Sequence, residues 1–181
     1  MPKSSTIQTI DIGNENLFGE FVTVHTPVNS VTSVANYINV GTNVHIAHDV
    51  NVEDRAIINS HSCLAGYVNI LRGANVGIGT NIHPRIIVGQ YSIIGLGSAV
   101  IRHVLPGATV AGNPQAYIKP NFVGMKRNDL SKICVEELSR CLNKDQVVLA
   151  DLSSDAQLIL MHFLEKLKNQ YIRNVPYVPT C

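Results

Sequence analysis

A large aliphatic residue recurs at every sixth position through the middle of the chain. All twelve of these positions between residues 34 and 100 hold Ile, Leu or Val, although the three types make up only 54 of the 181 residues. Chance does not produce such a run, so the six-residue period is a structural repeat. The repeated positions are Val34, Val40, Ile46, Val52, Ile58, Leu64, Ile70, Val76, Ile82, Val88, Ile94 and Val100. Four places after each stands a mostly small or branched residue.

A six-residue unit with one large and one small inward side chain cannot bury its apolar face alone. Stacked coils of such units can, and three units per coil make a triangular prism. Residues 34–105 then predict four coils, about 19 Å of stack at about 4.8 Å per coil. Segments 10–13 and 21–25 predict a ragged first coil or two, and 27–33 breaks the phase as a projecting loop.

The repeat ends near Gly112, because twelve of the 13 glycines lie at or before it. Beyond it, apolar residues at helical spacing predict helices over 129–143, with Asn128 or Asp129 as the cap, and over 154–172. We therefore expect an all-β hexapeptide-repeat region over 1–120 and a small C-terminal α-helical region with a tail over 121–181. Residues 174–181, which include two prolines, form that tail.

Composition narrows the class of protein. Hydrophobic residues make up 45% and charged residues 15% of the chain, which is typical of a packed fold rather than a disordered one. A net charge of +1 leaves no electrostatic footprint for nucleic acid or an anionic membrane. We find neither a signal-like apolar run at the start nor a stretch long enough to span a membrane, so we expect a cytoplasmic protein.

Several motifs resemble one family of hexapeptide enzymes, the UDP-N-acetylglucosamine acyltransferases of lipid A synthesis. The resemblance is carried by residues 44–49 (VHIAHD), 63–66 (CLAG), 111–113 (AGN) and 124–127 (GMKR). The acetyltransferases that act on nucleotide-linked amino sugars are also similar, over 48–114. The resemblance implies a left-handed parallel β-helix and a homotrimer with active sites between subunits. The chain lacks the first coils of the lipid A family and has a shorter helical tail.

His48 is the candidate general base, because acyl transfer from a thioester needs a group to take the proton of the attacking nucleophile. A carboxylate beside it, such as Asp49, would fix the imidazole tautomer and stabilise its charged form. The resemblance makes this pair the catalytic dyad of the family. The alternative is a solvated polar corner.

Further site residues follow from the resemblance alone. It places His45 and His83 in the substrate or acyl pocket, and the backbone N–H of Gly66 as the oxyanion donor. The alternatives are polar wall residues and a glycine required by a tight corner. The chain has Tyr67 where the lipid A family has another site histidine, and Pro84 where it has a glutamine, which puts the lipid A substrate in question.

The resemblance also assigns a nucleotide site and an acyl groove. Asn121, Lys126 and Arg127 match the part of the family that holds the nucleotide diphosphate, and an Arg fork can grip phosphate. A surface basic pair is the alternative. Leu96 matches a wall position where a glycine leaves the groove open to long acyl chains and a larger residue shortens it. Alternatively, Leu96 packs against a neighbouring coil.

The sequence therefore predicts an acyltransferase that uses an acetyl-CoA or acyl carrier protein thioester and a nucleotide-linked sugar, with acetyl and an amino acceptor slightly favoured. Fatty acyl transfer to a UDP-amino-sugar hydroxyl is the first alternative. A non-catalytic scaffold is the second. A zinc hydratase on a trimeric β-helix is the third, but the H-x4-H spacing of that group is absent. No metal is predicted.

Overall fold

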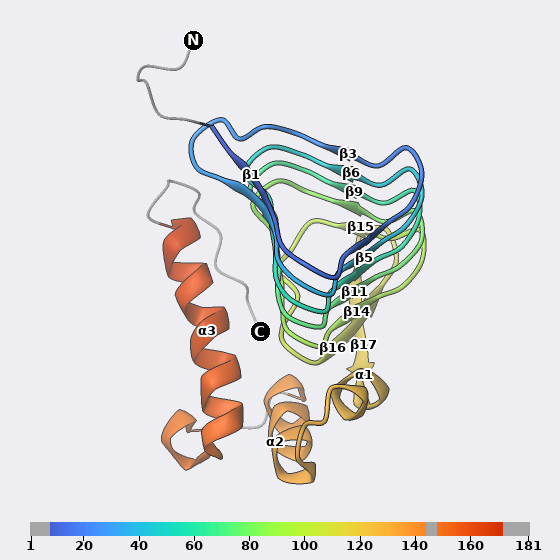
Figure 1. Ribbon diagram of the computed structural model, residues 1–181. Coiled ribbons are helices and arrows are strands. Elements are labelled where there is room, and N and C mark those ends of the chain that lie inside the picture. Colours follow the sequence, from blue (N-terminus) through green and yellow to red (C-terminus); the bar gives the residue numbers. More distant parts are fainter. Residues whose placement is uncertain (1–7, 144–147, 172–181) are drawn as a thin grey trace.

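The chain is a triangular β-prism with helices packed beside and below it (Figure 1). The computed structural model describes residues 8–143 and 148–171, so the predicted tail over 174–181 lies outside the described residues. Six successive turns of parallel strands make up the prism, which is a left-handed parallel β-helix. The fold predicted from the hexapeptide repeat is confirmed.

Three sheets form the sides of the prism, and each coil contributes one strand to each sheet. Sheet 1 contains β1 (Ile10–Ile12), β4 (Thr32–Val34), β7 (Asn51–Val52), β10 (Asn69–Ile70) and β13 (Ile87–Val88). Sheet 2 contains β2 (Leu17–Phe18), β5 (Asn39–Val40), β8 (Ile57–Ile58), β11 (Asn75–Val76), β14 (Ile93–Ile94), β16 (Ala108–Ala111) and β17 (Ala116–Pro120). Sheet 3 contains β3 (Thr23–Val24), β6 (His45–Ile46), β9 (Cys63–Leu64), β12 (Asn81–Ile82) and β15 (Ala99–Val100). Only β17 pairs antiparallel among these strands, and it closes the end of sheet 2.

The repeated aliphatic residues fill the inside of the prism. All twelve are buried, and the most exposed of them, Ile82, is only 3% exposed. Paired residues such as Asn51 and Asn69 are eighteen positions apart, which is three six-residue units. The period therefore sets the register, because a slip of one residue would turn every inward side chain outward.

The corners of the prism repeat a strained backbone conformation every six residues. Eleven consecutive corner residues have φ between +57° and +67°, in the left-handed region. They are Tyr37, Asn43, Asp49, Arg55, His61, Tyr67, Gly73, Gly79, Arg85, Tyr91 and Gly97. Only three are glycine, so most corners hold a side chain at a modest backbone cost. These corners project side chains outward in vertical columns, and one such column contains the site.

The helical region follows the prism directly, since β17 ends at Pro120 and a short helix, α1 (Phe122–Arg127), begins two residues later. The sequence analysis did not predict α1. The next helix, α2 (Lys132–Leu142), begins three residues later than expected, because Asp129 has φ +58° and cannot continue a helix. Ser131 is its actual N-cap and accepts a hydrogen bond from the backbone N–H of Cys134. A separate folding unit over 121–181 stays a prediction.

The last helix, α3 (Ser154–Tyr171), follows a short 3₁₀ turn (Leu149–Asp151) and lies along sheet 1 (Figure 1). Phe163 of α3 is buried against Leu71 and Ile87, which follow or form strands of that sheet. Glu53, which follows the central strand β7, pairs with His162 at 2.8 Å and Lys166 at 3.1 Å. These ion pairs hold the helix against sheet 1.

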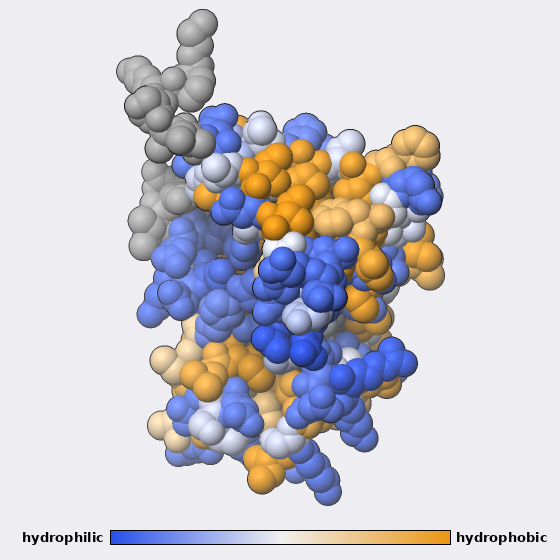
Figure 2. Space-filling model, in the orientation of Figure 1, coloured by the Kyte–Doolittle hydropathy of each residue, from blue (hydrophilic) through white to orange (hydrophobic). Residues whose placement is uncertain are grey.

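The N-terminal end of the prism is a complete first coil of β1, β2 and β3 rather than the ragged one expected. Figure 2 shows apolar side chains gathered over this upper part of the molecule. Leu17 and Phe21 of the first coil are 68% and 79% exposed. The phase break predicted over 27–33 lies between β3 and β4, but Thr32 and Ser33 belong to β4. The loop itself folds back onto the prism and contributes to the site described next.

Candidate active site

His48 and Asp49 lie at the corner where sheet 3 turns into sheet 1, between β6 and β7. Asp49 occupies the left-handed corner position with φ +59°. This conformation brings its carboxylate back toward the preceding side chain, and His48 Nδ1 lies 2.9 Å from Asp49 Oδ2. The structure thus forms the contact that the adjacent residues predicted.

The carboxylate of Asp49 sits in a cradle made by the loop before β4. Backbone N–H groups of Val28, Asn29 and Ser30 donate to its two oxygens at 2.8, 3.0 and 2.6 Å, and the Ser30 hydroxyl donates at 2.9 Å. Burial would raise the pKa of this carboxyl, but hydrogen bonds from the loop and from His48 lower it to about 2. The side chain is fully buried, and because these hydrogen bonds hold its pKa near 2 it is negatively charged at neutral pH.

An ionised carboxylate only accepts hydrogen bonds, so Nδ1 of His48 must carry a proton and donate it to Asp49. The other ring nitrogen, Nε2, is then the basic one. The His48 side chain is 37% exposed, which leaves the ring accessible to a substrate. This arrangement suits a general base whose tautomer is set by a buried anion.

Gly66 lies under the His48 ring, one coil further along the same corner. A Cβ built on Gly66 would lie 2.6 Å from both Cε1 and Nε2 of His48, closer than any ordinary contact. The glycine is therefore required by the position of the imidazole. Gly66 is buried, and within residues 8–143 and 148–171 its backbone N–H meets no backbone acceptor.

His45 lies on the outer face of β6, three residues before His48. Its Nδ1 is 2.9 Å from the Thr23 hydroxyl, and its ring meets the His25 ring at a right angle with centroids 4.6 Å apart. Burial and, secondarily, the nearby His25 lower the pKa of His45. The place in the substrate or acyl pocket that the resemblance implies for His45 stays a prediction.

The remaining predicted residues lie further away within one chain. His83 is exposed two coils along the same corner column, about 10 Å from the His48 coil at about 4.8 Å per coil. Leu96 lies at a different corner, between β14 and β15, and is 79% exposed. Most of its side chain therefore lies clear of the neighbouring coils in the described part of the chain. Its role in an acyl groove stays a prediction.

The predicted nucleotide residues lie beyond the last coil, at the opposite end of the prism from β6 (Figure 1). Asn121 caps α1: it accepts from the N–H of Gly124, and its Nδ2 donates to the Tyr91 carbonyl. This explains Asn121 structurally without a ligand. Lys126 and Arg127 are exposed on α1, free of ion pairs among the described residues. One chain alone does not bring them to His48.

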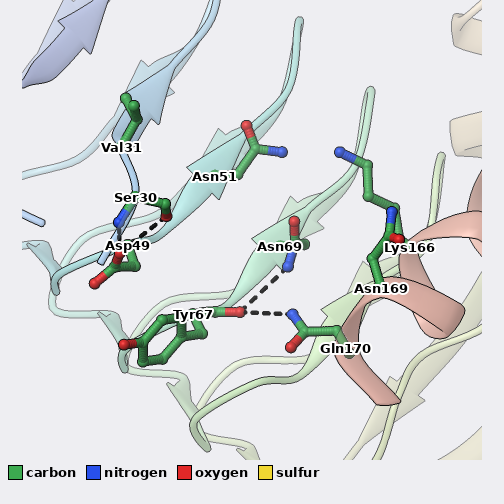
Figure 3. Close-up of a pocket in the computed structure, with 9 residues that line it drawn as sticks. All are labelled: Ser30, Val31, Asp49, Asn51, Tyr67, Asn69, Lys166, Asn169 and Gln170. Carbon is green, nitrogen blue, oxygen red and sulfur yellow. Dashed lines mark hydrogen bonds between the residues drawn. The ribbon is translucent and has the colours of Figure 1, made fainter. Parts of the chain in front are cut away.

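The sequence analysis missed a polar pocket on the sheet 1 side of the corner (Figure 3). It has a volume of about 470 Å³ and lies between the 28–31 loop, the outer face of sheet 1 and the last turns of α3. Its lining residues are Ser30, Val31, Asp49, Asn51, Tyr67, Asn69, Lys166, Asn169 and Gln170. The Asn residues at the outward positions of β7 and β10 were a visible signal, but nothing in the sequence showed that α3 would face them.

Two further findings concern metal sites and membrane spans. In the described part of the chain, no group of three His, Cys, Asp or Glu side chains is placed to hold a metal ion. Likewise, no described helix is long and apolar enough to cross a membrane.

Comparison with known proteins adds to this geometry. The chain is 29% identical over 171 residues to the acyl-[acyl-carrier-protein]–UDP-N-acetylglucosamine O-acyltransferase of Gloeothece citriformis (strain PCC 7424). The match covers 93% of this chain but 58% of the relative, so the chain spans little more than half of that protein's length. No protein-family model matches the chain.

Solved structures agree with the fold. The UDP-N-acetylglucosamine acyltransferase of Arabidopsis superposes with a TM-score of 0.72 at 25% identity, over 91% of this chain and 58% of that one. The corresponding enzyme of Campylobacter jejuni gives a TM-score of 0.78 at 24% identity, over 91% and 71%. This chain is thus similar to hexapeptide acyltransferases in both sequence and fold, as its motifs indicated.

Proposed function

We propose that this chain is an acyltransferase that moves an acyl group from a thioester to an amino or hydroxyl group of a nucleotide-linked sugar. The observation that carries the proposal is the His48–Asp49 pair, whose imidazole packs directly against Gly66 of the next coil. A base and an oxyanion donor side by side are what acyl transfer requires. The similarity to an enzyme named as such an acyltransferase supports the same reaction.

The proposed reaction uses His48 twice. Nε2 takes the proton of the acceptor hydroxyl or amine while the oxygen or nitrogen of that acceptor attacks the thioester carbonyl. The developing oxyanion accepts a hydrogen bond from the Gly66 N–H, and buried Asp49 stabilises the imidazolium. When the tetrahedral intermediate collapses, the carbon–sulfur bond breaks and the leaving thiolate takes the proton back from His48. The acylated sugar and a free thiol are the products.

Acetyl-CoA or an acyl carrier protein thioester would supply the acyl group. The name of the Gloeothece relative favours a carrier protein and a UDP-N-acetylglucosamine hydroxyl. The Leu96 side chain in place of a groove glycine favours a short acyl group instead. Both donors and a nucleotide-linked acceptor are cytoplasmic compounds, so the proposed reaction locates the protein there.

We also propose that the active unit is a homotrimer. Leu96, Lys126 and Arg127 lie on other corners or at the far end of the prism from His48, so only a neighbouring subunit could bring them to the dyad. Three copies around an axis would make three equivalent seams. Light scattering and activity measured at the same concentration test this, and a fully active monomer would contradict it.

A thiol-release assay tests the function directly. Acetyl-CoA and acyl carrier protein thioesters are offered with a panel of UDP- and dTDP-linked sugars, and thiol release that depends on one acceptor is expected. His48→Ala should lower that rate by about 100- to 10,000-fold, the usual contribution of a general base. His162→Gln is the matched control. Glutamine can keep the hydrogen bond to Glu53, which lies at the end of β7 away from His48.

Two results would contradict the proposal. One is near-wild-type turnover by a folded His48→Ala protein, which would remove the dyad from the reaction. The other is the absence of thiol release with every donor and acceptor, which would favour the non-catalytic scaffold.

A further inference from the structure

Tyr67 is the nearest aromatic neighbour of the candidate base. It occupies the left-handed corner position one coil after Asp49, with φ +64°. Its ring meets the His48 ring at 88° with centroids 5.2 Å apart. With Nδ1 bonded to Asp49 and a phenol ring packed against it, the imidazole has little freedom to rotate. The resemblance implies a histidine at this position in the lipid A family, so this chain has a phenol ring where that family has an imidazole.

The Tyr67 side chain is itself held from two directions. Its hydroxyl accepts a hydrogen bond from Asn29 Nδ2 in the loop that cradles Asp49. The Arg85 guanidinium lies over its ring at 4.2 Å from the centroid, close enough for a cation–π interaction. One guanidinium nitrogen of Arg85, Nη1, is buried without a hydrogen-bond acceptor in the described part of the chain, so the aromatic face is what holds that group.

The backbone of Tyr67 is fixed as well, through the wall of the polar pocket (Figure 3). Its carbonyl oxygen accepts from Asn69 Nδ2 at 3.2 Å and from Gln170 Nε2 of α3 at 2.9 Å. Phenol, ring face and carbonyl are therefore each restrained by a different element.

We propose that Tyr67 is a positioning residue that sets the orientation of the His48 imidazole, and that Asn29 couples it to Asp49. Asn29 makes both links: its backbone N–H donates to Asp49 Oδ1, and its side chain donates to the Tyr67 hydroxyl. The two neighbours that constrain the imidazole are thus tied to one loop residue. The catalytic consequence of this arrangement rests on the acyl transfer proposed above.

A double-mutant cycle tests the coupling. Tyr67→Phe keeps the ring and removes the hydroxyl, whereas Asn29→Ala removes the amide and keeps the backbone N–H that Asp49 uses. Each variant should lower kcat about 10-fold with the acceptor KM within about twofold, because a misaligned base weakens the transition state more than the bound substrate. The double variant should lose no more than either single one, since both remove the same bond.

Tyr37→Phe is the matched control. Tyr37 is also a left-handed corner residue with an arginine, Arg55, 5.8 Å from its ring centroid, but it lies at another corner and is 59% exposed. Its variant should keep full activity. Additive losses in the cycle would overturn the proposal, because Tyr67 and Asn29 would then act independently. A rise in KM alone would also overturn it, because Tyr67 would then act by touching substrate.

A second measurement does not depend on turnover. In ¹⁵N-edited NMR spectra, the His48 ring signals should shift in Tyr67→Phe and Asn29→Ala and stay in place in Tyr37→Phe. Unchanged His48 signals in the first two variants would overturn the positioning role. If these two variants show the shifts but the wild-type protein shows no acyl transfer, the positioning stands and the proposed function fails.

Discussion

The substitution Gly66→Ala tests the geometry of the site with a single methyl group. The added Cβ would lie 2.6 Å from Cε1 and Nε2 of His48, whereas ordinary contacts begin at 3.4 Å. Gly66 does not have a positive φ, so alanine itself fits the backbone. The His48 ring, which is partly exposed, must therefore be pushed away from the contacts with Asp49 and Tyr67 that hold it in place.

The expected displacement of the imidazole is about 1 Å, and a misplacement of that size costs about 100-fold in rate. Stability should change little, because the clash is with the end of a side chain rather than with the backbone. The assay is thiol release at saturating substrate, paired with thermal unfolding of the same preparation. We expect kcat to fall about 100-fold and the melting temperature to stay within a few degrees.

Gly79→Ala is the reciprocal control. Gly79 has φ +67° and open space around its Cα, so alanine there meets no neighbour but adopts an unfavourable backbone conformation. It should lose about 1 kcal/mol of stability and keep its activity. Wild-type kcat in Gly66→Ala would refute the reasoning, because it would mean that the His48 ring does not occupy this position during the reaction.

Three other predictions concern charge, acyl length and the nucleotide. The pKa of Asp49 is lowered to about 2 from 3.8, so its carboxylate adds stability above about pH 4 that is lost as the pH falls toward 2. Asp49→Asn should remove about 2 kcal/mol of this pH dependence of the unfolding free energy, measured by urea unfolding between pH 2 and 5. An unchanged pH profile would contradict this. Leu96 should confine the wild type to short acyl donors, and Leu96→Gly should extend the accepted acyl chain by three or four methylenes. Burial of those methylenes contributes about 3 kcal/mol, or more than 100-fold in affinity. A wild-type preference for chains of about twelve carbons or more would overturn this. Arg127→Ala should raise the KM for the sugar nucleotide about 10-fold with little change in kcat, because a phosphate contact is made equally in the bound substrate and in the transition state. An unchanged KM would exclude Arg127 from the site.

The prism was predictable from the sequence because its determinants are local and periodic. Each six-residue unit places one aliphatic side chain inward, and the next unit repeats the same choice, so the pattern specifies both the coil and its register. The His48–Asp49 contact was predictable for the same reason, since the two residues are adjacent and lie at one corner. Apolar spacing found α2 and α3 and gave the start of α3 at Ser154, but it missed the short α1 and placed the start of α2 three residues too early. A single left-handed residue such as Asp129 breaks a helix without any change in hydropathy.

The surroundings of the dyad depend instead on contacts between distant segments. The 28–30 loop breaks the repeat, so its position over Asp49 depends on how the chain returns to phase at β4. Gln170 reaches the Tyr67 carbonyl across 103 residues only because α3 packs along sheet 1. The sequence by itself determined the solenoid, its register and the residues of the dyad. The tertiary structure alone decided what cradles Asp49, what orients His48 and which candidates lie too far away, because hydrogen bonds between segments out of phase with the repeat leave no periodic trace in the chain.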